Sequence, residues 1–86
     1  MDANQKSIVR ALRTIGMSVL PLVDGVDILV GFRKMNFIFE IKDPAKPPSR
    51  RVLTPNEEKF HRGWGGQIHT VTTVAEIIRI IHERVI

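Results

Sequence analysis

Two apolar, β-prone segments separated by a short turn are the feature that most restricts the fold of this chain. Segments 27–33 and 36–42 contain the runs ILVGF and FIFEI, and Lys34-Met35 lies where the first gives way to the second. Branched and aromatic residues favour strands, and nearly continuous hydrophobicity is typical of strands covered on both faces. The two segments therefore predict a pair of central β-strands joined by a tight turn.

Helical periodicity and turn signals predict the elements on either side of this pair. A helix is expected over 4–14, because Gln5, Ile8, Val9 and Leu12 share one face, with Gly16 ending it. An edge strand broken by Pro21 should cover 17–23, followed by a turn at 24–25. The stretch 43–53 (DPAKPPSRRVL) is too rich in proline for a helix or strand and reads as a basic loop.

Two capping signals predict the later helices. Thr54, Pro55 and Glu57 are the expected start of a helix that ends in the region 63–66, and Thr73 with Glu76 predicts the start of the last helix. A short strand is expected between them, over 67–72. The order is then α-β-β-β-α-β-α, and the right-handed strand–helix–strand connection makes the fourth strand parallel to its partner. The prediction is one α/β domain over 1–86, with a mixed four-stranded sheet flanked by helices.

Composition limits the class of protein. With 86 residues, 43% hydrophobic and 26% charged, the chain has the balance of a single globular domain. The absence of cysteine excludes a disulfide framework, and no apolar run reaches the roughly 18–20 residues of a membrane span. We therefore expect a soluble, cytoplasmic protein. The net charge of +4 favours a polyanionic partner such as nucleic acid, and the small size favours a homodimer.

Asp27, Glu40 and Lys42 form the constellation with the clearest chemical meaning. In a strand alternate side chains share a face, so Glu40 and Lys42 project to the same side, about 6–7 Å apart. Asp27 begins the neighbouring strand and can complete a cluster of two carboxylates and one lysine. Charged groups at the end of an apolar strand are costly to bury without partners. The structural alternative is an ordinary Glu40–Lys42 ion pair on an exposed strand face.

Such a cluster suits a divalent cation. Two carboxylates with backbone carbonyl and water oxygens match the hard oxygen ligands that Mg²⁺ and Mn²⁺ prefer. A metal held there lowers the pKa of a bound water and neutralises charge on a phosphodiester. A neighbouring lysine can position or help deprotonate that water.

The run GVDILVGFRKMNFIFEIKD resembles the motif of the PD-(D/E)XK nuclease superfamily, with Asp27 as the first acid and Glu40-Ile41-Lys42 as the E-x-K element. More narrowly, DANQKSIVRALRTIG, DILVGFR, EIKD and KPPSRRVLTPNEEKFH, taken in this order, resemble the stand-alone VRR-NUC domains of bacteriophages and bacteria. The resemblance covers nearly the whole chain. It implies a restriction-endonuclease-like core and a metal-dependent endonuclease, often dimeric, acting on branched DNA such as four-way junctions.

The resemblance also implies roles for individual residues. Asp27, Glu40 and the carbonyl of Ile41 would bind Mg²⁺ or Mn²⁺, and Lys42 would act on the attacking water. The sequence departs from the family pattern at two positions: Val26 replaces the usual proline before the first acid, and Gln5 stands where many relatives carry a glutamate. Gln5 is a neutral ligand for metal or water, so metal affinity is the property that this departure affects.

Several further residues are candidates for substrate contact, each with a structural alternative. Lys46, Arg50 and Arg51 lie in the loop after the E-x-K strand and would bind phosphates, or else form a solvated loop. Gln67 could orient the scissile phosphate or a metal-bound water, or simply end a strand. Glu57 is first a helix cap and Asp43 a turn residue. The DNA-binding surface could extend along the second helix through Lys59, Arg62 and Trp64. The alternative for Trp64 is a packing role.

The sequence leaves two classes of function open. The leading prediction is hydrolysis of DNA phosphodiesters by a homodimer with one site per subunit, in a bacterial or phage-infected cell. The rival is a basic DNA-binding module that keeps the nuclease fold but cleaves little or not at all, which Gln5 in place of an acid favours. A purely structural adaptor would leave the cluster of Asp27, Glu40 and Lys42 unexplained.

Overall fold

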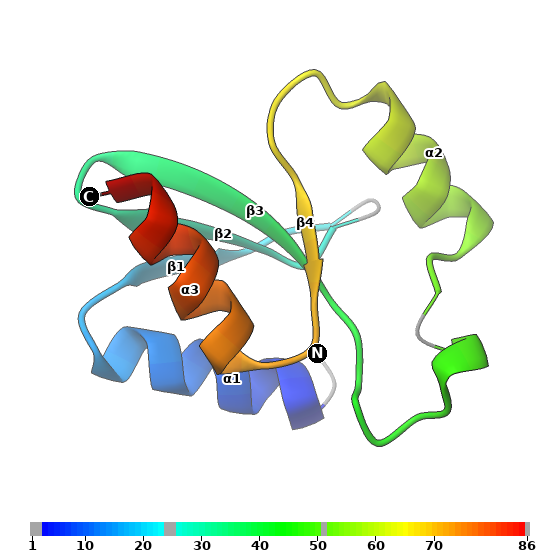
Figure 1. Ribbon diagram of the computed structural model, residues 1–86, viewed down its shortest axis with the longest axis horizontal. Helices are drawn as coiled ribbons and strands as arrows, with labels where there is room; N and C mark the ends of the chain where they lie inside the picture. The colour runs from blue at the N-terminus through cyan, green and yellow to red at the C-terminus, as the bar shows by residue number, and fades with distance from the viewer. Residues whose placement is uncertain (1–2, 24–25, 51, 86) are drawn as a thin grey trace.

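The computed structural model describes residues 3–23, 26–50 and 52–85, without the side chain of Arg50. Its elements follow the predicted order: α1 (Ala3–Thr14), β1 (Ser18–Pro21), β2 (Ile28–Phe32), β3 (Met35–Ile41), α2 (Pro55–Gly63), β4 (His69–Val71) and α3 (Val74–Val85), with a 3-10 turn, η1 (Pro48–Arg50), in the basic loop (Figure 1). Among the described residues no helix has the length and apolar character needed to cross a bilayer. The turn predicted at 24–25 lies outside these ranges.

The four strands form one mixed sheet in the order β1-β2-β3-β4. β1 pairs with β2 and β2 with β3 in antiparallel fashion, whereas β4 runs parallel to β3. The mixed sheet and the parallel fourth strand are thereby confirmed. Arg33 and Lys34 form the turn between β2 and β3, with φ values of 51° and 67°. Left-handed backbone at both positions matches the strand twist of a tight hairpin. The turn therefore lies one residue earlier than the predicted position at Lys34-Met35.

The core lies between the sheet and the two terminal helices. α1 and α3 pack on the same face of the sheet (Figure 1). The spacing of apolar residues along both helices places one stripe of each against the strands. The central, almost fully buried members of this core come from both helices and from the sheet: Leu12, Ile77, Ile81, Ile28, Val30, Phe37, Phe39 and Val71.

The opposite face of the sheet is only partly covered. Leu20, Leu29 and Ile38 lie side by side across β1, β2 and β3, where Leu29 and Ile38 are half-buried and Leu20 is 57% exposed. Complete cover on both faces, which the sequence led us to expect, is therefore wrong for this face. α2 fully buries none of its residues and lies outside the sheet, beyond β4 (Figure 1). A continuous apolar run does not by itself determine whether another layer covers it.

The predicted capping box of α2 is present in full, whereas that of α3 is present only in part. The full capping box at the start of α2 is confirmed, with Thr54 and Glu57 bonding to each other's backbone N–H groups. At the start of α3 the Thr73 hydroxyl accepts the Glu76 N–H at 3.2 Å as predicted. The Glu76 carboxylate, however, accepts the N–H of Thr72 at 3.1 Å, one residue before the cap. The predicted reciprocal box is therefore displaced by one residue at α3.

Candidate metal centre

Asp27 and Glu40 are brought together by the register of the β2–β3 hairpin. Ile28 lies opposite Phe39, so Asp27, one residue before β2, lies beside Glu40 in β3. The Asp27 N–H donates to the Phe39 carbonyl at 3.2 Å, and its carboxylate Oδ2 accepts the Ile41 N–H at 2.6 Å. These two bonds hold the carboxylate at the end of the hairpin.

The central site residues that the sequence predicted line one small cavity of about 160 Å³. Its wall contains Asp27, Glu40, Lys42 and Ile41, together with three residues from the loop and from α2: Asp43, Lys46 and Glu57. The predicted convergence of two carboxylates and one lysine is therefore present in the structure. It follows from two periodicities, the alternation along β3 and the pairing across the hairpin.

Lys42 is held between two carboxylates. Its Nζ lies 2.6 Å from Glu57 Oε1 and 3.8 Å from Glu40 Oε2, and its side chain is 13% exposed. The shorter distance assigns most of its electrostatic interaction to Glu57. Burial alone would raise the pKa of Glu57, but hydrogen bonds from Lys42 and from the Thr54 N–H outweigh it and lower this pKa to about 2. Glu57 thus connects the cap of α2 to the cavity, although the sequence suggested mainly the cap.

Glu40 is the most unusual group in the cavity. Its residue is 2% exposed, and within the described part of the chain its Oε1 has no hydrogen-bond partner. Burial raises the pKa of Glu40 to about 9, assisted by the neighbouring carboxylates of Asp27 and Glu57. Without a further positive charge, Glu40 therefore keeps its proton at neutral pH. A buried carboxyl with an unsatisfied oxygen beside a second carboxylate is a site that a cation would stabilise.

The cavity offers oxygen donors of the type that hard divalent cations bind, but only a few of them. Among the described residues no three or more His, Cys, Asp or Glu side chains are grouped closely enough to hold a metal ion. In the wall of the cavity, Asp43 is bonded to the Ala45 N–H and Glu57 to Lys42, so the donors considered for a metal are the carboxylates of Asp27 and Glu40 with the backbone of Ile41. Oxygen donors without nitrogen or sulfur suit Mg²⁺ or Mn²⁺, which keep several waters in their coordination shell.

The first turn of α1 supports the backbone of the site. The Asn4 side chain donates to the Lys42 carbonyl at 3.2 Å, and Gln5 Nε2 lies 3.5 Å from the Asp27 carbonyl. Gln5 is buried, as its position on the apolar face predicted, but it does not line the cavity. Gln5 therefore contacts the Asp27 backbone and supports the site from outside the wall of the cavity. Asn4 had no signal in the sequence, because its partner is 38 residues away.

Gln67 lies away from the cavity. Its Nε2 donates to the Asn36 carbonyl at 3.3 Å, and its Oε1 is 2.9 Å from His69 Nε2. Asn36 is four residues before Glu40 in β3, which corresponds to roughly 13 Å along an extended strand. The predicted contact of Gln67 with the scissile phosphate is therefore corrected: this residue precedes β4 and lies near the other end of β3. The strand begins at His69, two residues later than the sequence indicated.

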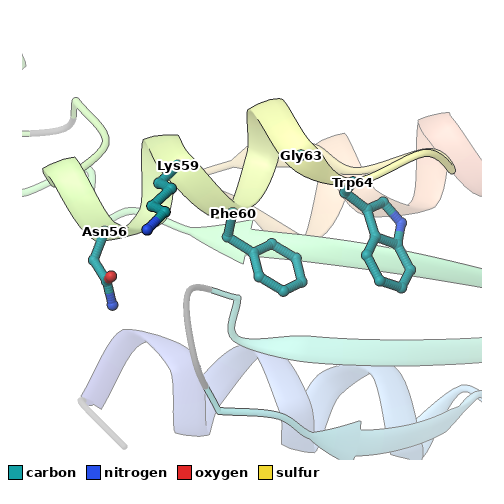
Figure 2. Close-up of a pocket in the computed structure, with 5 residues that line it drawn as sticks. All are labelled: Asn56, Lys59, Phe60, Gly63 and Trp64. Carbon is teal, nitrogen blue, oxygen red and sulfur yellow. The ribbon is translucent and has the colours of Figure 1, made fainter.

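The basic candidates are divided between two places. Lys46 lines the cavity, whereas Lys59 and Trp64 line a separate pocket along α2 that Arg62 does not border (Figure 2). Asp43 forms the predicted turn, where its side chain accepts the Ala45 N–H at 2.9 Å, and it also lines the cavity. The Arg50 side chain and the whole of Arg51 lie outside the described residues.

Comparisons of the chain with protein-family models, with curated proteins and with solved structures found no match. The geometry of the cavity and the order of the motifs are therefore the grounds on which a function is proposed.

Proposed function

We propose that this chain is a metal-dependent endonuclease that hydrolyses phosphodiester bonds in DNA, with a restriction-endonuclease-like core of the VRR-NUC type. The observation that carries the proposal is one cavity holding two adjacent carboxylates and a lysine, with the buried Oε1 of Glu40 unsatisfied. A purely structural ion pair would not need the second carboxylate. The E-x-K order and the basic loop beside the cavity agree with this proposal.

Each cavity residue has a role that follows from its contacts. Asp27 and Glu40, with the Ile41 carbonyl, would hold Mg²⁺ or Mn²⁺, which when bound supplies charge neutralisation and activation of water. Asp27 is oriented by the Ile41 N–H, so its second oxygen can face the cation. Lys42, held by Glu57, orients the attacking water and stabilises negative charge on the phosphate. Lys46 contributes electrostatic attraction for the DNA backbone.

A DNA-binding module without cleavage is the second candidate. Gln5 provides no third acid and does not line the cavity, and the described residues contain no three-residue acidic or histidine cluster for a metal. Both functions predict affinity for DNA, but only the nuclease predicts a requirement for a divalent cation. We also propose a homodimer in the bacterial or phage-infected cytoplasm, which would allow paired cuts in a branched substrate.

Cleavage assays distinguish the two candidates. The protein should nick a four-way junction or a linear duplex in Mg²⁺ or Mn²⁺, and EDTA should abolish nicking. Asp27→Asn keeps an oxygen that can accept the Ile41 N–H but removes the charge, so it should lose cleavage by about 100-fold or more while remaining folded. Glu83→Gln, on the exposed surface of α3, is the matched control and should cleave normally. Nicking that persists in EDTA contradicts the metal mechanism, and binding without cleavage supports the second candidate.

A further inference from the structure

One face of α2, together with Trp64 directly after it, carries aromatic side chains that the core does not use. Asn56, Lys59, Phe60, Gly63 and Trp64 follow helical spacing and line an open cavity of about 410 Å³. Figure 2 shows the four longer side chains projecting from the same side of α2. This spacing normally identifies the stripe that a helix buries. Here α2 fully buries none of its residues, and Trp64 remains 44% exposed.

Phe60 and Trp64 form a pre-organised pair of stacked rings. Their rings are stacked, with centroids 5.4 Å apart and planes inclined by 14°. Gly66 allows the indole to lie close to the chain after α2, since a Cβ at this position would be 3.0 Å from Trp64 Nε1. The indole is therefore supported by Phe60 and by the backbone while much of it faces solvent. A ring held in this way loses little freedom when another flat group stacks on it.

We propose that Phe60 and Trp64 are a stacking platform for an unpaired base of the DNA strand whose backbone enters the candidate metal centre. This inference rests on the proposed nuclease function and names its substrate class, DNA with an unpaired base near the cut. Stacking on aromatic rings is the usual way in which proteins hold unpaired bases, whatever the sequence. Lys59 adds a positive charge beside the rings, and Asn56 adds an amide that can bond to a base edge. A basic chain with a lysine in this stripe favours a polyanion over an apolar protein partner.

The distance between the platform and the cavity sets the position of that base. Glu57, near the start of α2, bonds to Lys42 in the cavity, and Trp64 follows seven residues later. At 1.5 Å of rise per residue the separation along the helix is about 10 Å. A stacked strand advances about 3.4 Å per nucleotide. The base on Trp64 therefore lies about three nucleotides from the phosphate at the cavity, as at a branch point or a frayed end.

The sole tryptophan of the chain provides a direct probe. In EDTA, a single-stranded oligothymidylate of about twelve nucleotides should quench Trp64 fluorescence, whereas an abasic oligonucleotide of equal length should bind without comparable quenching. In the anisotropy of a labelled oligothymidylate, which needs no tryptophan, Trp64→Leu should weaken binding by about 5- to 150-fold, the range measured for loss of one stacking contact. Trp64→Phe should restore most of the affinity. Ile15→Ala removes a similarly exposed apolar side chain after α1 and is the matched control.

The outcomes separate this inference from the proposed function. Equal quenching by the abasic oligonucleotide or by blunt duplex would overturn the platform, and so would a fluorescence change that depends on protein concentration without DNA. Binding in EDTA needs no turnover, so quenching by a protein that never cleaves supports the platform and contradicts the nuclease. If Trp64→Leu cleaves a branched substrate as well as the wild type does, the result supports the nuclease and contradicts the platform. Circular dichroism checks the fold of each variant, and the comparison of oligothymidylate with the abasic oligonucleotide on the wild-type protein decides the result if Trp64→Leu does not fold.

Discussion

The buried carboxyl of Glu40 should make this protein less stable as the pH rises, and Glu40→Gln should remove that effect. The folded state raises the pKa of Glu40 from 4.5 to about 9, because the carboxyl is buried beside Asp27 and Glu57. Between these two values the folded protein holds a proton that the unfolded chain has released. Stability therefore falls as pH rises through this window, and this loss of stability has not begun below pH 4.5, where both states are protonated. Glutamine has nearly the same shape and does not titrate.

The expected size follows from the window. Each pH unit is worth at most about 1.4 kcal/mol for one proton, and about 2.5 units separate pH 4.5 from pH 7, so the ceiling is about 3.5 kcal/mol. An effective dielectric constant of about 20 describes even buried protein sites and weakens the interaction, so a loss of about 1–2 kcal/mol is expected. For a domain of this size that corresponds to a fall in Tm of roughly 4–16 °C.

Other titrating groups do not imitate this difference. Hydrogen bonds lower the pKa of Glu57 to about 2, so its contribution changes between about pH 2 and 4.5, below the window. Burial and the charge of Arg84 lower the pKa of His69 from 6.5, so His69 makes the fold more stable as pH rises towards 6.5. That effect is common to both proteins and cancels when the variant is compared with the wild type.

Chemical denaturation in EDTA at pH 5, 6 and 7 would measure the effect. The stability of the wild type relative to Glu40→Gln should decrease steadily across this series, while Glu83→Gln, which alters an exposed pair on α3, should follow the wild type. Parallel curves for wild type and Glu40→Gln would refute the reasoning, because they would mean that Glu40 has the same proton affinity in the folded and unfolded states.

Two further predictions concern Lys42 and its support by α2. Lys42→Ala should reduce cleavage by about 100- to 10,000-fold, while DNA affinity in filter binding changes little, because the residue is proposed to act on the reaction and not as an anchor; a matching loss of affinity would contradict this role. Thr54→Ala removes half of the capping box and should lower stability by about 1 kcal/mol in denaturant unfolding. It should also reduce cleavage, because Glu57 joins that cap to Lys42, whereas Thr73→Ala at α3 should lower stability alone.

The local pattern of the chain was sufficient to predict the elements and part of the site. Capping residues, helical spacing and the β-prone pair of segments predicted the element order and the mixed sheet, because these signals act between residues close in sequence. Alternation along a strand likewise placed Glu40 and Lys42 on one side of β3. The apolar run could not indicate how much of the second sheet face is covered, since that depends on where α2 lies.

The tertiary structure alone decided the surroundings of these groups. Packing of α1 brings Asn4 to Lys42, and packing of α2 brings Glu57 to the same lysine, across separations of 38 and 15 residues. The same long-range arrangement leaves Gln67 near Asn36 and outside the cavity. Glu40 owes its raised pKa to burial next to another carboxylate, a property of the assembled fold. Local sequence determines which side chains share a face, whereas packing between distant elements determines which charges share a cavity and how much water reaches them.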